Sequence, residues 1–271
     1  MLDVARTRCA DQVASRNADT ARVLVILPTY NEADNVLDLV TQVLAQSSQI
    51  EVLVVDDNSP DGTGQLVAEA ARSEPRLSLL KRPGKLGLGT AYLAGFQRGL
   101  DRGFDRIFTM DCDFSHNPRY LPAMLTAMDD YDVVVGSRYV PGGGVENWPW
   151  PRRLLSRFAN LYARTLLRLD VRDCTAGFRG YSREVLETVD PFVIRSSGYS
   201  FLEEMAWRVT RCGFTMGEIP IIFEQRKAGS SKIESSEIYW AALYVLVTAV
   251  RPPKLPPGSR TNRSKSKTVS E

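Results

Sequence analysis

The stretch Arg106-Ile-Phe-Thr-Met-Asp-Cys-Asp113 is a β-branched and aromatic run that ends in two carboxylates, Asp111 and Asp113. Such a run predicts a buried strand over 105–111. Carboxylates placed directly after a buried strand lose hydration, so they need a cation or hydrogen-bond donors beside them. Mg²⁺ and Mn²⁺ are commonly held through one or two carboxylates together with substrate phosphates. The same pair also fits a turn or a helix cap, so this motif alone leaves both interpretations open.

Two further predicted strands also end in polar residues. The strand 22–28 runs into Thr29-Tyr30-Asn31-Glu32, and the strand 50–56 runs into the segment 57–62. In an open α/β sheet the ligand binds outside the carboxyl ends of the strands. Three polar strand ends therefore predict one shared crevice.

The order of the predicted elements decides the fold class. Strand and helix patterns alternate from 22 to 136, which is typical of an α/β domain with a mainly parallel sheet and right-handed crossovers. The expected strands are 22–28, 50–56, 76–81, 105–111 and 131–136, and the expected helices are 32–46, 61–72, 88–102 and 118–129.

The pattern changes after Gly136. The segment 139–151 is rich in Gly, Pro and Trp and is long for a simple connection, which favours a functional lid. Helices over 152–168 and 200–212, a strand over 214–224 and a basic loop over 226–232 are expected to follow. This half of the chain is better suited to an acceptor than to a nucleotide.

Composition places the chain among globular enzymes, since 44% of its residues are hydrophobic and 24% are charged. Its four cysteines, Cys9, Cys112, Cys174 and Cys212, show no C-x-x-C spacing, and no apolar leader opens the chain. We therefore expect reduced thiols in a cytosolic protein. With His116 as the single histidine, a metal site built from Cys and His is not expected.

Five motifs resemble, in order and spacing, those of the dolichol-phosphate or polyprenol-phosphate mannosyltransferases, which belong to glycosyltransferase family 2 and have the GT-A fold. They are Pro28-Thr-Tyr-Asn-Glu32, Asp56-Asp-Asn-Ser-Pro-Asp-Gly-Thr63, Leu86-Gly-Leu-Gly-Thr-Ala-Tyr92, Asp111-Cys-Asp-Phe-Ser-His116 and Gly136-Ser-Arg138. The resemblance extends over 22–250 and includes Asp173-x-Thr-x-Gly-Phe-Arg179 and a loop with Arg226 and Lys232.

This resemblance implies a single GT-A domain, Rossmann-like and with a mainly parallel central sheet. It also implies an enzyme that moves mannose from GDP-mannose to a polyprenyl phosphate, with inversion, under Mg²⁺ or Mn²⁺. The product would be a lipid-linked mannose donor. The implied organisation is a flexible lead over 1–20, a domain over 21–250 and a basic disordered tail over 251–271. Within the domain, 21–136 would form the nucleotide-sugar half and 137–250 the acceptor half.

The resemblance also assigns residues to the donor site. Asp113 with Ser115 resembles the metal pair, and Asp113 is one expected catalytic residue. The residues expected to bind the nucleotide sugar are Pro28, Tyr30, Glu32, Val55, Asp57, Asp111, Cys112, Asp113, Arg226 and Lys232. Cys112 stands where the family usually has a small Ala, which is nearly isosteric.

The acceptor that the resemblance implies is a phosphate monoester. A phosphate monoester has a second pKa of about 6, so it is largely ionised at neutral pH and needs no general base. The protein must instead hold two anionic substrates together, and guanidinium groups suit phosphate oxygens. We place the acceptor phosphate at Arg138, the second expected catalytic residue, and at Arg152 with Ser156, which lie at i and i+4 of one helix. The resemblance supports this placement.

Simpler roles stay open for several residues. Glu32 and Asp61 also fit helix caps, and His116 beside Asn-Pro fits a turn as well as a metal loop. Glu203 and Glu204 stand where many relatives outside the lipid-phosphate group keep a catalytic carboxylate, and here we expect Glu204 to orient the arginines of the acceptor site, Arg138 and Arg152.

A lipid acceptor also bears on localisation. The apolar run 238–250 has 13 residues, fewer than the roughly 20 that span a bilayer, so we expect a peripheral protein at the cytoplasmic membrane face. The segment 251–271 holds six Lys and Arg against one Glu, and it could bind anionic lipid or merely aid solubility. Trp148 and Trp150 could anchor at the interface or pack inside as a lid hinge. An integral-membrane partner is a further means of recruitment, and no nucleic-acid partner is expected.

Two alternatives to this function remain. One keeps the fold but uses another sugar nucleotide, such as UDP-glucose. The other is a noncatalytic nucleotide-binding or scaffold protein, against which the metal pair and the arginines of the acceptor half argue.

Overall fold

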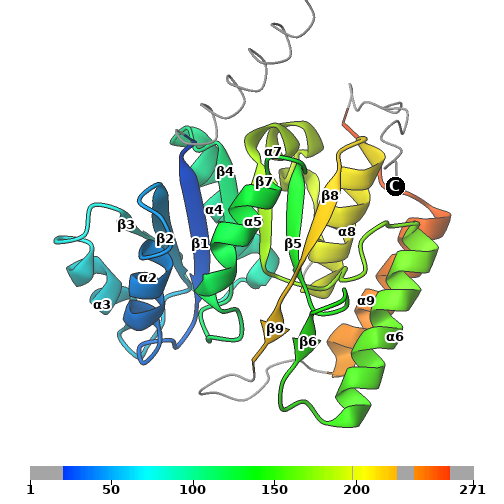
Figure 1. The fold of residues 1–271 in the computed structure, drawn as a ribbon, viewed down its shortest axis with the longest axis horizontal. Helices are drawn as coiled ribbons and strands as arrows, with labels where there is room; N and C mark the ends of the chain where they lie inside the picture. Colours follow the sequence, from blue (N-terminus) through cyan, green and yellow to red (C-terminus); the bar gives the residue numbers. More distant parts are fainter. Residues whose placement is uncertain (1–20, 197, 225–234, 257–271) are drawn as a thin grey trace, which may run out of the picture.

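The structure is a computed structural model that describes residues 21–196, 198–224 and 235–256. A seven-stranded sheet crosses the middle of the molecule, with helices on both faces (Figure 1). Its strand order is β3-β2-β1-β4-β7-β5-β8. The strands are β1 (Val23–Thr29), β2 (Ile50–Asp56), β3 (Leu77–Lys81), β4 (Arg106–Thr109), β5 (Val133–Ser137), β7 (Arg179–Ser182) and β8 (Met216–Pro220).

The expected mainly parallel α/β sheet is confirmed, with one exception. β7 runs antiparallel to both of its neighbours, β4 and β5, and all other pairs in the sheet are parallel. Neither β7 nor the helix α7 (Arg183–Val189) was predicted, because β7 has only four residues and no alternating pattern. β7 comes from the acceptor half and lies between two strands of the other half, so the two expected halves are interleaved.

Two apolar layers hold the helices to the sheet. One core cluster joins the sheet to α2 (Val36–Leu44), α3 (Thr63–Ala70) and α5 (Leu121–Ala127). A second joins its other face to α4 (Leu88–Asp101), α7 and α8 (Tyr199–Arg211). The packing is close at Gly180 of β7, where an added Cβ would lie 2.5 Å from the ring of Phe108 in β4. A side chain there would force β4 and β7 apart.

Two long helices form a third layer beside the β8 end of the sheet (Figure 1). α6 (Trp150–Leu167) and α9 (Ser235–Val250) pack against each other, and α9 also packs against α8. Leu167, Trp207 and Val245 lie in the apolar cluster that joins the three helices. Among the described residues, no helix combines the length and the apolar character needed to cross a membrane.

The segment after β5 is more ordered than the expected lid. Its residues 144–145 form β6 (Gly144–Val145), which pairs in parallel with β9 (Ile222–Phe223). Trp148 packs edge-on against Phe223, with ring centroids 5.4 Å apart. The segment is thereby attached to the sheet edge, and the expected single strand over 214–224 is divided into β8 and β9. The expected loop over 226–232 lies outside the described residues.

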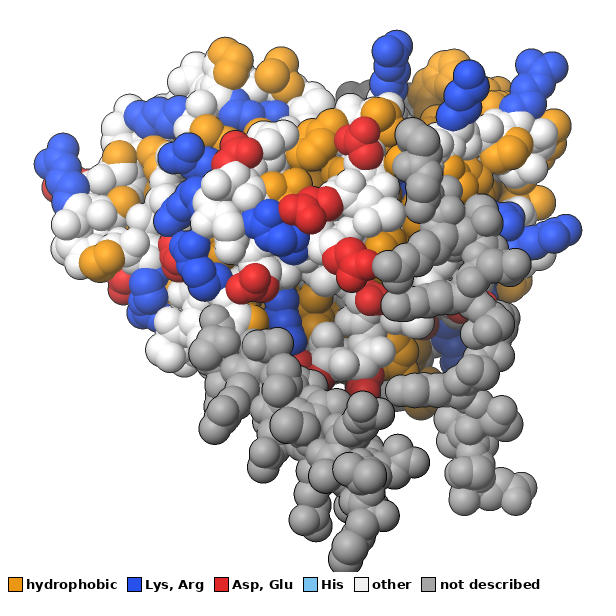
Figure 2. All heavy atoms as spheres, turned by 90° about the horizontal axis from the view of Figure 1, so that it is seen from above, with side chains coloured by type: hydrophobic (Ala, Val, Ile, Leu, Met, Phe, Trp, Pro, Cys, Tyr) orange, Lys and Arg blue, Asp and Glu red, His pale blue; other side chains and the backbone are white. Residues whose placement is uncertain are grey.

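The carboxyl ends of the parallel strands, at the lower edge of the sheet in Figure 1, all face the same side of the molecule. Figure 2 looks onto the opposite, upper side, where acidic and basic side chains are interspersed. There Glu51 pairs with both Arg22 and Arg102 at the amino ends of the strands. Paired surface charges of this kind contribute little energy. In an open α/β sheet, ligands bind outside the carboxyl ends of the strands.

Candidate active site

Three loops meet at the carboxyl ends of β1, β2 and β4. Each contains a residue with left-handed backbone geometry that is not glycine: Asn31 has φ 61°, Asn58 has φ 57° and Phe114 has φ 62°. Asn tolerates this conformation, but for a bulky aromatic residue it is unusual and costs energy. Strained loops at one edge of a sheet are frequent at ligand sites, so the geometry supports the predicted crevice.

The loop after β4 holds the two carboxylates of the sequence motif. Asp113 is only 4% exposed, and its Oδ1 accepts hydrogen bonds from the main-chain N–H and the hydroxyl of Ser115, at 3.0 and 2.5 Å. The Asp111 side chain is 29% exposed and accepts a hydrogen bond from the Tyr92 hydroxyl at 3.3 Å. The structure thus brings together the two residues of the expected metal pair, Asp113 and Ser115, and leaves the nearby Asp111 partly exposed.

The donor set fits a hard divalent cation. Within the described residues, no group of three or more His, Cys, Asp or Glu side chains surrounds a possible metal position. Mg²⁺ and Mn²⁺ suit such a sparse set, since water and substrate phosphates complete their coordination. His116 belongs to the fold instead, because its Nδ1 accepts the main-chain N–H of Asp111 and its ring packs against Phe178.

The other expected donor-site residues fall into two groups. Pro28, Tyr30 and Glu32 follow or end β1 and are partly exposed, as a ligand contact requires. The side chains of Val55 and Cys112 are buried in the two core layers, so a ligand could reach them only through their main chain. Arg226 and Lys232 lie outside the described residues.

Asp57 has a partner that the sequence did not indicate. Both of its carboxylate oxygens accept hydrogen bonds from the Arg82 guanidinium, at 2.6 and 2.7 Å. Arg82 also donates to the hydroxyl of Thr90 at 2.7 Å. Through Arg82, Asp57 at the end of β2 is therefore connected to the start of α4. This leaves its expected contact with the nucleotide untested.

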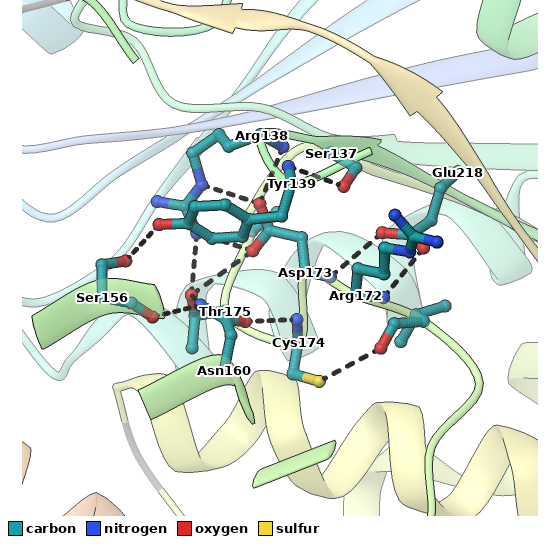
Figure 3. A network of polar contacts seen from close by, with 12 residues as sticks. Ser137, Arg138, Tyr139, Ser156, Asn160, Arg172, Asp173, Cys174, Thr175 and Glu218 are labelled. Carbon is teal, nitrogen blue, oxygen red and sulfur yellow. Dashed lines mark hydrogen bonds and ion pairs between the residues drawn. The ribbon is translucent and has the colours of Figure 1, made fainter. Parts of the chain in front are cut away.

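A second set of polar groups surrounds Arg138 at the end of β5 (Figure 3). Its guanidinium donates to both oxygens of Asp173, at 2.7 and 2.6 Å, and to the hydroxyl of Thr175 at 2.8 Å. Asp173 is completely buried. Burial alone would raise the pKa of Asp173, but the charge and hydrogen bonds of Arg138 outweigh it and hold that pKa below its ordinary value. The pair fixes the direction of the Arg138 side chain.

The helix α6 contributes the remaining residues of the expected acceptor site. Ser156 and Tyr139 share a hydrogen bond of 2.6 Å between their hydroxyls, as Figure 3 shows. The Arg152 guanidinium lies 4.0 Å from the centroid of the Trp148 ring. Trp148 is only 8% exposed and lies against the partly exposed Arg152, whereas Trp150 is 74% exposed. The two tryptophans therefore have different environments: of the two alternatives left open, Trp148 packs inside, and the exposed Trp150 keeps the interfacial role as a prediction.

Arg138, Arg152 and Ser156 line one cavity, as predicted, between α6 and α9. Its volume is about 470 Å³. Most of its wall is apolar and comes from Trp148, Leu155, Phe158, Ala159, Tyr162, Ala241, Ala242 and Val245. The cavity thus combines cationic groups with a long apolar wall.

Two acidic residues of α8 differ from expectation. Glu204 contacts neither Arg138 nor Arg152 through any hydrogen bond or ion pair of the described residues. It pairs with Arg208 at 2.7 Å and accepts hydrogen bonds from the hydroxyls of Ser196 and Tyr244. Its expected role as an orienter is therefore wrong. Glu203 lines the acceptor cavity instead, and the local sequence pattern does not distinguish which of the two adjacent residues faces inward.

Residues 24–190 match the model of a family described as glycosyl transferase family 2. The chain belongs to glycosyl transferase family 2. It is 47% identical over 234 residues to polyprenol monophosphomannose synthase of Mycolicibacterium smegmatis, covering 86% of this chain and 88% of that protein. It is 42% identical over 224 residues to undecaprenyl-phosphate mannosyltransferase of Micrococcus luteus, covering 83% and 92%. The family expected from the motifs is confirmed.

Solved structures agree on the fold of this family 2 chain. Glucosyl-3-phosphoglycerate synthase of Mycobacterium tuberculosis, in complex with Mn²⁺, UDP and phosphoglyceric acid, gives a TM-score of 0.64 at 15% identity, over 89% of this chain and 82% of that one. The mannosyltransferase PcManGT of Pyrobaculum calidifontis, in complex with GDP-Man and Mn²⁺, gives a TM-score of 0.55 at 18% identity. The likeness covers 88% of this chain and 67% of that one. These likenesses extend to the arrangement of the sheet and helices and support the expected GT-A fold.

Proposed function

We propose that the chain transfers mannose from GDP-mannose to a polyprenyl monophosphate, with inversion at the anomeric carbon and with Mg²⁺ or Mn²⁺ bound. The two relatives described above are named for mannose transfer to a polyprenyl or undecaprenyl phosphate. The observation that carries the proposal is the acceptor cavity, in which Arg138 and Arg152 stand beside an apolar wall. A lipid phosphate has the same two parts, an anionic head and an apolar chain.

The described residues divide the work between the substrates. Asp111, Asp113 and Ser115 would hold the cation, which neutralises the charge that develops on the departing diphosphate. Arg138 and Arg152 would bind and orient the acceptor phosphate. Asp173 keeps the Arg138 guanidinium in place, and the Arg152 guanidinium lies against the Trp148 ring. Since the phosphate is already ionised, attack on the sugar needs no proton removal.

The donor is the part of the proposal that fold alone does not decide, because structures of this fold are known with UDP and with GDP-Man. We expect GDP with Mg²⁺ to raise the melting temperature of the chain and UDP to raise it much less. A ligand that binds only the folded state adds about 2.7 kcal/mol of stability when its concentration is a hundred times its Kd. Thermal melting with each nucleotide measures this. A larger rise in melting temperature with UDP than with GDP would contradict GDP-mannose and indicate a uridine-diphosphate sugar as the donor.

We further propose that α6 and α9 face the membrane at its cytoplasmic side. Both helices expose large apolar side chains, namely Trp150, Leu154, Leu155, Phe158 and Leu161 of α6 and Tyr239, Trp240, Leu246, Val247 and Val250 of α9. These helices also form the wall of the acceptor cavity, so a polyprenyl chain could pass from the bilayer into it. Contiguous exposed apolar patches commonly mark such surfaces.

Vesicle co-sedimentation tests this orientation. Trp150→Ala combined with Leu154→Asn should lower binding to neutral and anionic vesicles alike, because both side chains are exposed and apolar. Val193→Asn is the matched control, since Val193 is exposed on the 3₁₀ turn Pro191–Val193 and belongs to neither α6 nor α9. Deleting 251–271 should remove only a salt-sensitive part of the binding to anionic vesicles. Sedimentation unaffected by any of these changes would assign recruitment to a partner protein.

A further inference from the structure

Glu203 is a buried acidic side chain that faces the acceptor cavity. It is 4% exposed and lines the cavity together with Arg138, Arg152 and Thr175. Among the residues that the structure describes, its Oε2 is the one buried side-chain oxygen or nitrogen without a hydrogen-bond partner. A buried polar atom left in this way is costly, so its presence in a ligand cavity points to a partner that arrives with the ligand.

The surroundings of Glu203 keep its carboxyl group neutral. Burial raises the pKa of Glu203 to about 8, and the nearby positive charge of Arg179 only partly opposes this. Arg179 is itself completely buried, and its guanidinium donates to the main-chain carbonyls of Ala176, Leu202 and Cys174. It forms no hydrogen bond or ion pair with Glu203 in the described structure. The carboxyl group is therefore protonated at neutral pH.

The other charged groups around this position already have partners or lie on the cavity wall. Asp173 is paired with Arg138, and Glu218 of β8 accepts the main-chain N–H groups of Arg172 and Asp173. On α8 itself, Glu204 is paired with Arg208. The Cys174 thiol stays neutral, because burial raises its pKa to about 12. α6 offers Arg152 to the cavity, and the described side chains that α9 contributes are Ala241, Ala242 and Val245.

We propose that Glu203 binds the acceptor phosphate as a neutral carboxylic acid, donating its O–H in a hydrogen bond to a phosphate oxygen; this inference rests on the proposed function. The proton stays on Glu203, and no covalent bond changes. An ionised Glu203 would instead repel a phosphate dianion at close range in a cavity of low polarity. Acceptor binding is therefore coupled to the protonation of Glu203, so ionised protein must take up a proton when the phosphate binds.

The coupling predicts a pH profile for acceptor affinity. Above pH 7 the acceptor phosphate remains a dianion and the arginines remain charged, so their charges are constant. Calorimetry with farnesyl phosphate, used as a short acceptor, should give an affinity about tenfold weaker at pH 9 than at pH 7. Glu203→Gln keeps a neutral hydrogen-bond donor, so its affinity should vary less than about twofold over the same range. Glu204→Gln, on the same helix, should keep the pH profile of acceptor affinity of the unmodified chain, although the loss of its buried pair with Arg208 lowers the stability of the fold.

A second measurement does not depend on a variant. Calorimetry of the unmodified chain at pH 8.5 in two buffers of different ionisation enthalpy should show an uptake of about three-quarters of a proton per farnesyl phosphate bound, since about a quarter of Glu203 is already protonated at that pH. No proton uptake, or the same loss of affinity at high pH in Glu203→Gln, would overturn the inference. So would a Glu203→Gln variant that loses turnover at every pH while it binds the acceptor normally, because that is the behaviour of a general base. If pH-dependent binding holds but no mannose is transferred from GDP-mannose, the proposed function fails and this inference stands.

Discussion

Asp113→Ala should abolish metal-dependent mannosyl transfer and leave the fold intact. Asp113 lies next to Asp111 in the loop after β4, and its contacts to Ser115 are local to that loop. Removing one of two nearby carboxylates relieves repulsion when no cation is bound. A divalent cation supplies several kcal/mol of stabilisation to the charge on a leaving phosphate, and about 4 kcal/mol corresponds to about a thousandfold in rate. Turnover measured across a Mg²⁺ titration tests this.

Asp61→Ala is the control for this experiment. Asp61 lies in the loop after β2; partial burial would raise its pKa, but the hydrogen bonds that its oxygens accept from Ala33 and Thr63 outweigh this and lower it. Its loss should cost about 1 kcal/mol of stability and leave the metal dependence unchanged. An Asp113→Ala protein that responds to Mg²⁺ like the unmodified chain would rule out the proposed metal position.

Arg152→Ala should lower transfer to polyprenyl phosphate by about tenfold to a hundredfold while the affinity for GDP-mannose stays the same. A charge-assisted hydrogen bond to phosphate is worth about 1.5–3 kcal/mol. Arg152 is partly exposed, so its loss should have little effect on folding. Arg153→Ala is the matched control, because Arg153 is exposed and does not line the cavity. Calorimetric GDP-mannose affinity that falls in parallel with activity would place Arg152 at the donor.

Arg138→Ala should lower transfer even further, but part of that loss should come from unfolding. It leaves the fully buried Asp173 carboxylate without its ion pair, and such a change costs about 3–5 kcal/mol. Arg138→Met combined with Asp173→Leu removes both charges and should recover much of the stability without recovering activity. Denaturant unfolding and transfer assays on the same preparations separate the two effects. Recovery of activity in the double variant would show that Arg138 has only a structural role.

The sequence was sufficient to predict the strands and residue positions that depend on local pattern. Parallel strands ending in Asp56 and Thr109 were visible as apolar runs, and the convergence of their polar ends followed from the geometry of α/β sheets. Arg138, Arg152 and Ser156 were correctly brought together because helical spacing and strand ends fix their positions.

The parts that the sequence could not predict depend on contacts distant along the chain. β7 is short and gains its place from pairing with two strands of the other half. Whether Glu203 or Glu204 faces the cavity is decided by the rotation of α8 against α9, and helical periodicity does not distinguish adjacent acidic residues on a mostly buried helix. The bidentate partner of Asp57, Arg82, lies 25 residues away in sequence.

The central claim is that mannose passes from GDP-mannose to a lipid phosphate. The most direct test incubates the full chain with radiolabelled GDP-mannose, a polyprenyl monophosphate and Mg²⁺, and then separates the lipids by organic extraction. The account predicts label in the organic phase, dependent on both the lipid phosphate and the cation, and much less label when UDP-glucose is the donor. Label that stays in the aqueous phase with GDP-mannose, under conditions in which the chain is folded and binds the lipid phosphate, would contradict it.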